Sequence, residues 1–139
     1  MILPFDITDY DEVLSLWKRC EGIGLSGADE RANILVYLER NPGSSFVARA
    51  DGVLVGAVLC GHDGRRGFIH HLAVDPTWRR RGIGTALVEA CVSSLRSNGI
   101  QKCHVSVYHE NEGAVGWWRR RGWVLRTDIA VMSAEIESV

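Results

Sequence analysis

Apolar residues recur at helical spacing through the first forty positions of the chain. A first helix is predicted from about residue 9 to residue 20, capped by Thr8 or Asp9, with an apolar face formed by Val13, Leu16, Trp17 and Cys20. A loop with three glycines over 21–27 follows, and a second helix ends at Asn41-Pro42-Gly43. This part of the chain is therefore predicted to be a helix, a mobile loop and a second helix.

The pattern then changes to apolar runs that are typical of strands. Residues 45–50 and 53–61 flank Asp51-Gly52, a dipeptide that favours the positive φ of a tight hairpin turn. A third strand over 68–74 ends at Asp75-Pro76, a long helix begins within 81–85 and stops at Asn98-Gly99, and another strand covers 102–108. A strand, a helix and a strand form a βαβ unit, so these two strands are predicted to be parallel. Asn111 can cap a last helix that ends at Gly122, and 123–136 is a weaker β region.

Composition limits the number of domains and the kind of partner. A chain of 139 residues that is 46% hydrophobic can bury one core, so a single domain over 1–139 is expected. The formal net charge of −1 excludes the broad positive field of a protein that coats nucleic acid. Four cysteines without zinc-type spacing are predicted to be buried free thiols in a reducing compartment. Because no run is apolar enough for a signal peptide or a membrane span, a cytoplasmic location is expected.

One loop has the residues of a phosphate site: Arg79-Arg80-Arg81-Gly82-Ile83-Gly84-Thr85, between a strand and a helix. A diphosphate needs several N–H groups pointing to one place, and the first turn of a helix offers them with the positive end of its dipole behind them. A side chain at Gly82 or Gly84 would hold the anion away from the backbone. The loop matches neither a Walker loop nor a dinucleotide fingerprint. An exposed basic helix start is the alternative interpretation.

Four short motifs follow one another along the chain: Leu72-Ala73-Val74-Asp75-Pro76, Arg79 to Gly84, Asn111-Glu112-Gly113-Ala114 and Arg121-Gly122-Trp123. In this order they resemble the GCN5-related N-acetyltransferase (GNAT) family, and the match covers nearly the whole chain. The resemblance implies an α/β (α+β) fold, with a mixed, twisted sheet of six or seven strands flanked by about four helices. The fourth and fifth strands of that sheet would be parallel and would splay apart.

The resemblance also implies where coenzyme A is held. Pantetheine would lie in the gap between the splayed strands and pair with the backbone of Leu72, Ala73 and Val74. The pyrophosphate would bind the N–H groups of Arg80, Arg81, Gly82, Ile83, Gly84 and Thr85 beside the Arg79 side chain. Asn111 would contact the pantetheine or the phosphates. The N–H of Leu72 would be the oxyanion donor, a role that suits a preorganised N–H beside a forming tetrahedral centre.

An amine attacks a thioester only when it is neutral, and a lysine-like amine has a pKa of roughly 10, so a base is useful. Strand alternation puts His70 with Phe68 on one face and His71 with Ile69 on the other. The resemblance implies that the Phe68 face looks toward the acceptor, although some family members carry glutamate where this chain has phenylalanine. His70 is therefore the first candidate for the base, and a purely structural role for it is an equal alternative. We expect His71 to be structural.

The departing thiolate can use an acid. The resemblance places this donor seven residues after the capping asparagine, where family members usually carry tyrosine and this chain carries Trp118. An indole N–H cannot give up a proton to a thiolate. Tyr108, at the end of the predicted strand over 102–108, is the nearest replacement, and we favour the alternative that it is a strand-end aromatic.

The predicted activity is N-acetyl transfer from acetyl-CoA to a primary amine by direct transfer through a tetrahedral intermediate, without a metal. The acceptor is a small-molecule or peptide amine, and neither nucleic acid nor a membrane is an expected partner. A homodimer is left open. Because Trp118 stands where a proton donor is usual, the alternative is an acyl-CoA-binding sensor or regulatory domain with little catalysis.

Overall fold

A five-stranded sheet in the order β1-β2-β3-β4-β5 carries the candidate site. The computed structural model describes residues 1–136, which form one unit over 1–106 and a second unit that begins at Val107. The strands, all in the first unit, are β1 (Ile2–Pro4), β2 (Phe46–Ala50), β3 (Val53–His62), β4 (Gly67–Val74) and β5 (Cys103–Val105). Neighbouring strands are antiparallel except β4 and β5, which are parallel. The predicted mixed sheet and its parallel pair are confirmed.

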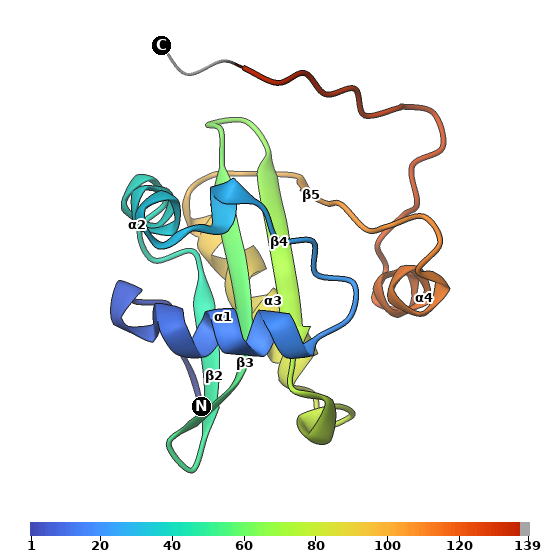
Figure 1. Cartoon of the computed structure of the whole chain (residues 1–139). Helices are drawn as coiled ribbons and strands as arrows, with labels where there is room; N and C mark the ends of the chain where they lie inside the picture. Colours follow the sequence, from blue (N-terminus) through green and yellow to red (C-terminus); the bar gives the residue numbers. More distant parts are fainter. Residues whose placement is uncertain (137–139) are drawn as a thin grey trace. The chain divides into compact units, whose positions relative to one another are not determined.

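Three helices cover this sheet: α1 (Tyr10–Arg19), α2 (Arg31–Arg40) and α3 (Ile83–Ser97). Figure 1 shows α1 in front of the strands and α3 behind them. Residues of α1 and α2 pack with residues of the sheet in one core cluster, so these two helices lie on the same face. The predicted boundaries of α1 and α3 and the predicted end of α2 agree with the structure within a few residues. Three short 3₁₀ helices complete this unit, at Ile7–Asp9, Gly27–Asp29 and Pro76–Trp78.

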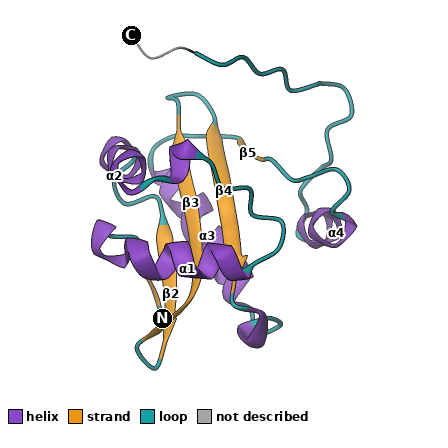
Figure 2. Ribbon diagram, in the orientation of Figure 1, coloured by secondary structure: helices purple, strands orange, loops and turns teal. Residues whose placement is uncertain are grey.

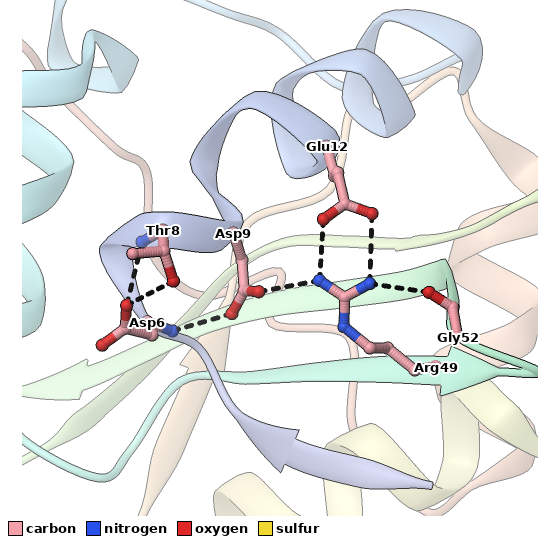
Figure 3. A network of polar contacts seen from close by, with 6 residues as sticks. All are labelled: Asp6, Thr8, Asp9, Glu12, Arg49 and Gly52. Carbon is pink, nitrogen blue, oxygen red and sulfur yellow. Dashed lines mark hydrogen bonds and ion pairs between the residues drawn. The ribbon is translucent and has the colours of Figure 1, made fainter.

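The start of α1 is fastened to β2 by one arginine. Arg49 donates hydrogen bonds to the carboxylates of Asp9 and Glu12 and to the carbonyl of Gly52, as Figure 3 shows. Asp9 also accepts a hydrogen bond from the N–H of Asp6, which closes the capping box of the first 3₁₀ helix. The guanidinium of Arg49 on β2 and the carboxylates of Asp9 and Glu12 thereby hold the start of α1 against the sheet.

The second unit contains α4 (Glu112–Arg120), and Asn111 caps it as predicted, since Asn111 Oδ1 accepts the N–H of Ala114 at 3.1 Å. Trp118 is buried between the rings of Trp117 and Trp123.

The predicted β region over 123–136 has no strand, and Figure 2 draws it as loop. The sheet thus has five strands among the described residues, and the prediction of six or seven was wrong. The apolar residues of the segment are strongly exposed, so no neighbour buries them: Val124, Val131, Met132 and Ile136. A β-prone sequence forms a strand only where it finds pairing and burial, so propensity alone misled the prediction here. No helix within residues 1–136 is long and apolar enough to cross a membrane.

A bulge in β4 breaks the alternation that the sequence predicted. Ala73 pairs with Ala57 and His70 pairs with Leu59, so two residues of β4, His71 and Leu72, lie opposite one residue of β3. His71 adopts a left-handed backbone with φ of +51°. The His71 ring contacts Trp17 of α1 and the His70 ring contacts Tyr37 of α2, two helices of the same face. The prediction that the two histidines lie on opposite faces was therefore wrong.

Candidate active site

The predicted phosphate loop forms a concave turn of backbone between β4 and α3. Asp75 caps the 3₁₀ helix that follows β4, since its carboxylate accepts the N–H of Thr77 at 3.0 Å. Arg80 and Gly82 then adopt left-handed conformations, with φ of +63° and +79°, while Arg81 between them does not. An alternation of this kind turns successive N–H groups toward one point and makes a nest for an anion.

The start of α3 supplies further donors to the same place. The first hydrogen bond within the helix runs from the N–H of Ala86 to the carbonyl of Gly82 at 3.0 Å. The N–H groups of Ile83 and Gly84 come before it and have no acceptor inside the helix. A Cβ added at Gly82 would meet no atom within 4 Å, so the backbone there is open to a ligand. The geometry fits a diphosphate held by backbone donors at the positive end of a helix.

The second half of β4 presents an unpaired edge beside this loop. The parallel register of β4 and β5 ends at Ile69 opposite Val105, and β5 ends there too. Residues 70–74 therefore have no strand next to them on that edge within residues 1–106. This is the predicted splay of the fourth and fifth strands. Leu72 and Val74 are partly exposed along it, whereas Ala73 faces the core.

Arg79 is engaged by two groups outside the loop. Its Nε donates to the carbonyl of Val74 at 3.1 Å and its Nη1 to the carboxylate of Glu21 at 2.9 Å. The guanidinium holds the pKa of Glu21 below its ordinary value. Arg79 therefore links the segment after α1 to the end of β4, and its predicted contact with the pyrophosphate stays a prediction. Arg81, by contrast, stacks on Trp78, with its guanidinium 4.5 Å from the ring centre.

His70 lies on the α1/α2 face of β4, at the start of the unpaired edge. The residue is exposed, yet the protein packed around its ring, and then the neighbouring His71, lower the pKa of its imidazole. A lowered pKa favours the neutral form, which can accept a proton. The ring of Tyr37 lies 6.2 Å away, and its hydroxyl is buried without a hydrogen-bond partner among residues 1–136.

His71 is held by a carboxylate that sequence reasoning did not single out. Its Nε2 lies 2.9 Å from Oδ1 of Asp29, which belongs to the short 3₁₀ helix between α1 and α2. Asp29 is 42 positions away in sequence, so no local pattern pointed to the pair. The nearest sequence signal was the cluster of glycines that ends at Gly27, which predicts only a loop.

The remaining predicted site residues belong to the second unit. Tyr108 is 59% exposed, and its carbonyl accepts the N–H of Asn111 at 3.0 Å. The strand predicted over 102–108 ends at Val105, so Tyr108 lies in the turn before α4 and not at a strand end. The pairing of β5 with β4 ends at Val105, and the backbone that follows leads into the turn before α4 and does not continue as a strand.

A sequence model of the Acetyltransferase (GNAT) family matches residues 10–123, which span the nest, β4 and α4. The chain belongs to the GNAT family. An acetyltransferase of Pectobacterium atrosepticum is 33% identical over 112 residues, which cover 81% of this chain and 79% of the relative.

Solved structures agree on the GNAT fold. Ard1 from Thermoplasma volcanium superposes with a TM-score of 0.80 at 24% identity, over 91% of this chain and 83% of that one. AAC(6')-Iy in complex with the bisubstrate analogue CoA-S-monomethyl-acetylneamine superposes with a TM-score of 0.79 at 20% identity, over 98% and 97% of the two chains. The predicted family and fold class are therefore confirmed.

Proposed function

We propose that this protein is an acetyl-CoA-dependent N-acetyltransferase that moves the acetyl group to a primary amine by direct transfer. The observation that carries the proposal is the nest at Arg80–Gly84 next to the unpaired edge of β4 at residues 70–74. The nest suits the pyrophosphate of coenzyme A, and an unpaired strand edge suits the amide groups of pantetheine. The binding of a coenzyme A bisubstrate analogue by AAC(6')-Iy, which shares the fold, supports the same assignment.

In this proposal the residues of the nest bind the diphosphate of coenzyme A, and those of β4 orient its thioester. Arg80 to Thr85 hold the diphosphate through backbone N–H groups, Arg79 and Arg81 add positive charge nearby, and Asn111 contacts the cofactor. Leu72, Ala73 and Val74 pair with pantetheine, which sets the thioester beside the bulge. The N–H of Leu72 donates a hydrogen bond to the carbonyl oxygen as it becomes an oxyanion.

The proton balance of the transfer needs one acceptor and one donor. The ammonium of the acceptor loses a proton to His70, and its nitrogen forms a bond to the thioester carbon. The carbon–sulfur bond then breaks, and the thiolate takes up one proton, for which Tyr108 is the proposed donor. The second proton of the nitrogen restores the Tyr108 hydroxyl through water, and His70 releases the first proton to water. A neutral imidazole on His70 is what this step requires, and its lowered pKa supports it.

A second function, the sensing of acyl-CoA without much turnover, is favoured by one observation. Trp118 occupies the position of the usual proton donor and is packed between two other tryptophans, so its indole serves the core of its own unit. A coenzyme A thiol has a pKa near 8.5 and is a fair leaving group, so we expect the loss of this donor to slow turnover without abolishing it.

Mass spectrometry of acceptor mixtures tests the proposal. The full chain is incubated with acetyl-CoA and a panel of lysine, peptides with free N-termini, amino acids and aminoglycosides, and free thiol is measured in parallel. Acetylated product with matching thiol release is the expected result. Tight binding of acetyl-CoA without a product on any amine would favour the sensor.

A matched pair of variants tests the nest itself. Gly84→Glu puts a carboxylate at the proposed diphosphate site and should abolish binding of coenzyme A in calorimetry. Ser93→Glu adds the same charge to an exposed position further along α3 and should bind like the wild type. Equal binding by both variants would refute the nest as the site.

A further inference from the structure

The bulge of β4 contains a residue in an unfavourable backbone conformation. His71 has a φ of +51°, in the left-handed region that residues other than glycine adopt uncommonly, although asparagine, aspartate and histidine adopt it more often than the rest. Such a conformation persists only where the surroundings hold it in place, and it is often found at functional sites. The contacts that hold His71 in this conformation, and the backbone N–H that the bulge positions, are therefore candidates for a functional role.

Three contacts hold this residue, and all come from the α1/α2 face. The imidazole Nε2 lies 2.9 Å from Asp29 Oδ1. The ring of Trp17 meets the imidazole edge to face, with 5.1 Å between ring centres. The indole N–H of Trp17 donates to the backbone carbonyl of His71 at 3.3 Å. Side chain and backbone of His71 are both fixed.

Asp29 is itself held rigidly. Its Oδ2 accepts the N–H of Ser26 at 3.0 Å, and its carbonyl accepts the hydroxyl of Tyr10 at 2.6 Å. Its side chain is only 10% exposed. These contacts hold the carboxylate of Asp29 in place, and the carboxylate in turn holds the imidazole of His71.

We propose that Asp29, Trp17 and His71 are positioning residues that hold the bulge so that the N–H of Leu72 faces the thioester. This inference rests on the proposed function. Leu72 follows His71 directly, so rotation of His71 back to an extended conformation would turn the Leu72 peptide plane and move its N–H. The three residues exchange no proton with the substrates.

Two pairs of variants separate positioning from proton transfer. Asp29→Ala removes the partner of His71. Asp29→Asn keeps both contacts, because its carbonyl can accept the Ser26 N–H while its amide donates to Nε2 of a neutral imidazole in the other tautomer. That tautomer carries its proton on Nδ1, so a histidine acting as a base would be disabled, as in a serine-protease triad. In the second pair, His71→Ala loses the side-chain contacts, whereas His71→Gln carries its amide nitrogen to about the place of Nε2 and can still donate to Asp29.

Positioning predicts a fall in kcat of about 10²-fold for both alanine variants, because the misplacement of one catalytic group costs about 10²-fold and the loss of one oxyanion donor about 10² to 10³-fold. Both conservative variants should stay within about threefold of the wild type, a rescue that distinguishes geometry from chemistry. The Kd of coenzyme A should change less than kcat, because the nest at Arg80–Gly84 holds the diphosphate and only the pairing of pantetheine with Leu72 depends on the bulge. Arg49→Ala is the stability control, since its partners Asp9 and Glu12 lie at the start of α1 and Trp17 lies near the other end, and its kcat at a temperature well below its Tm should equal that of the wild type.

Two results would overturn the inference. Unchanged kcat in Asp29→Ala and His71→Ala would mean that the bulge needs no support. A loss in Asp29→Asn as large as in Asp29→Ala would mean that the pair moves protons.

A readout without substrates separates failure of the inference from failure of the proposed function. The HN–Hα coupling of His71 reports its φ, and the amide signal of Leu72 reports the orientation of its peptide plane. Both should shift in Asp29→Ala and stay near wild-type values in Asp29→Asn. If the wild type acetylates no amine, the proposed function fails, whereas unshifted signals in Asp29→Ala refute the positioning by themselves.

Discussion

The anchoring of α1 by Arg49 gives the most direct test of the fold that supports the site. Arg49→Ala removes hydrogen bonds of 2.8 Å to Asp9, 2.8 and 3.1 Å to Glu12 and 3.1 Å to the Gly52 carbonyl. The side chain of Asp9 is only 15% exposed and that of Arg49 only 22%, whereas that of Glu12 is 51% exposed. The two carboxylates therefore contribute unequally.

The loss of the contact with Asp9 should cost about 1.5 kcal/mol, the low end for a charged hydrogen bond, because Asp9 keeps the N–H of Asp6 as a partner. The half-exposed pair with Glu12 should add roughly 0.5 kcal/mol. The expected loss in free energy of unfolding is therefore about 2 kcal/mol, which corresponds to a fall in Tm of roughly 6 °C for a chain of this size.

The difference in free energy of unfolding between the wild type and Arg49→Ala can be measured by urea unfolding, with tryptophan fluorescence as the signal, at neutral and at acidic pH. The hydrogen bond from Arg49 lowers the pKa of Glu12 in the folded state. A carboxylate with a lowered folded pKa adds stability above its unfolded pKa of about 4.3, and that stability is lost as the pH falls through the folded pKa. The difference between wild type and Arg49→Ala should therefore shrink as the pH falls below about 4.3, by the part that Glu12 contributes.

Arg126→Ala is the matched control, because Arg126 also contacts a carboxylate at 2.9 Å, that of Asp128, but in an exposed pair two residues apart. It should change stability little, because an ion pair in open solvent is screened by water and ions. A loss for Arg49→Ala as small as that of the control, or one that does not change with pH, would refute the reasoning.

Three further outcomes are expected from single positions. Gly82→Ala should lower stability by about 1 to 2 kcal/mol without coenzyme A, because alanine is strained at a φ of +79°, and Gly82→Asn should cost less; equal losses would contradict a backbone origin. Gly67→Ala puts a Cβ 2.5 Å from Cδ1 of the buried Leu95 and should cost about 1 to 3 kcal/mol, and this cost should largely vanish in a Leu95→Ala background when both are compared by denaturant unfolding. If His70 is the base, wild-type kcat/KM should fall as the pH drops through a pKa below the ordinary value of about 6.5, and His70→Gln should lower kcat by about 10² to 10⁴-fold and lose that acid limb; an acid limb that survives in the variant would place the base elsewhere.

Local patterns predicted the elements whose geometry depends on neighbours in sequence. Asp51-Gly52 forms the predicted hairpin turn, with φ of +52° and +79°, and Asn111 caps α4 through an N–H only three residues away. The nest belongs to the same class, because a glycine-rich turn before a helix sets its own backbone directions. The family resemblance rested on these short motifs, and for that reason it was found from the sequence.

The length of the sheet could not be predicted in the same way. The segment 123–136 is rich in residues with high strand propensity, yet it pairs with no strand and its apolar side chains are exposed. β5 ends at Val105, where its pairing with β4 also ends, so this end likewise depends on a strand far away in sequence. Pairing partners lie far away along the chain, so residue preferences within one segment do not decide them.

The sequence by itself thus determined the order of the helices and of β2 to β5, the glycine-rich turn before α3 and the family. Only the tertiary structure decided the bulge at His71, because its left-handed backbone is offset by Trp17 and Asp29, which lie 54 and 42 positions away. It also decided that Arg79 binds Glu21, 58 positions away, and that both histidines lie on one face. Strain at one residue can be balanced by contacts from anywhere in the fold, and a sequence pattern of period two contains no record of them.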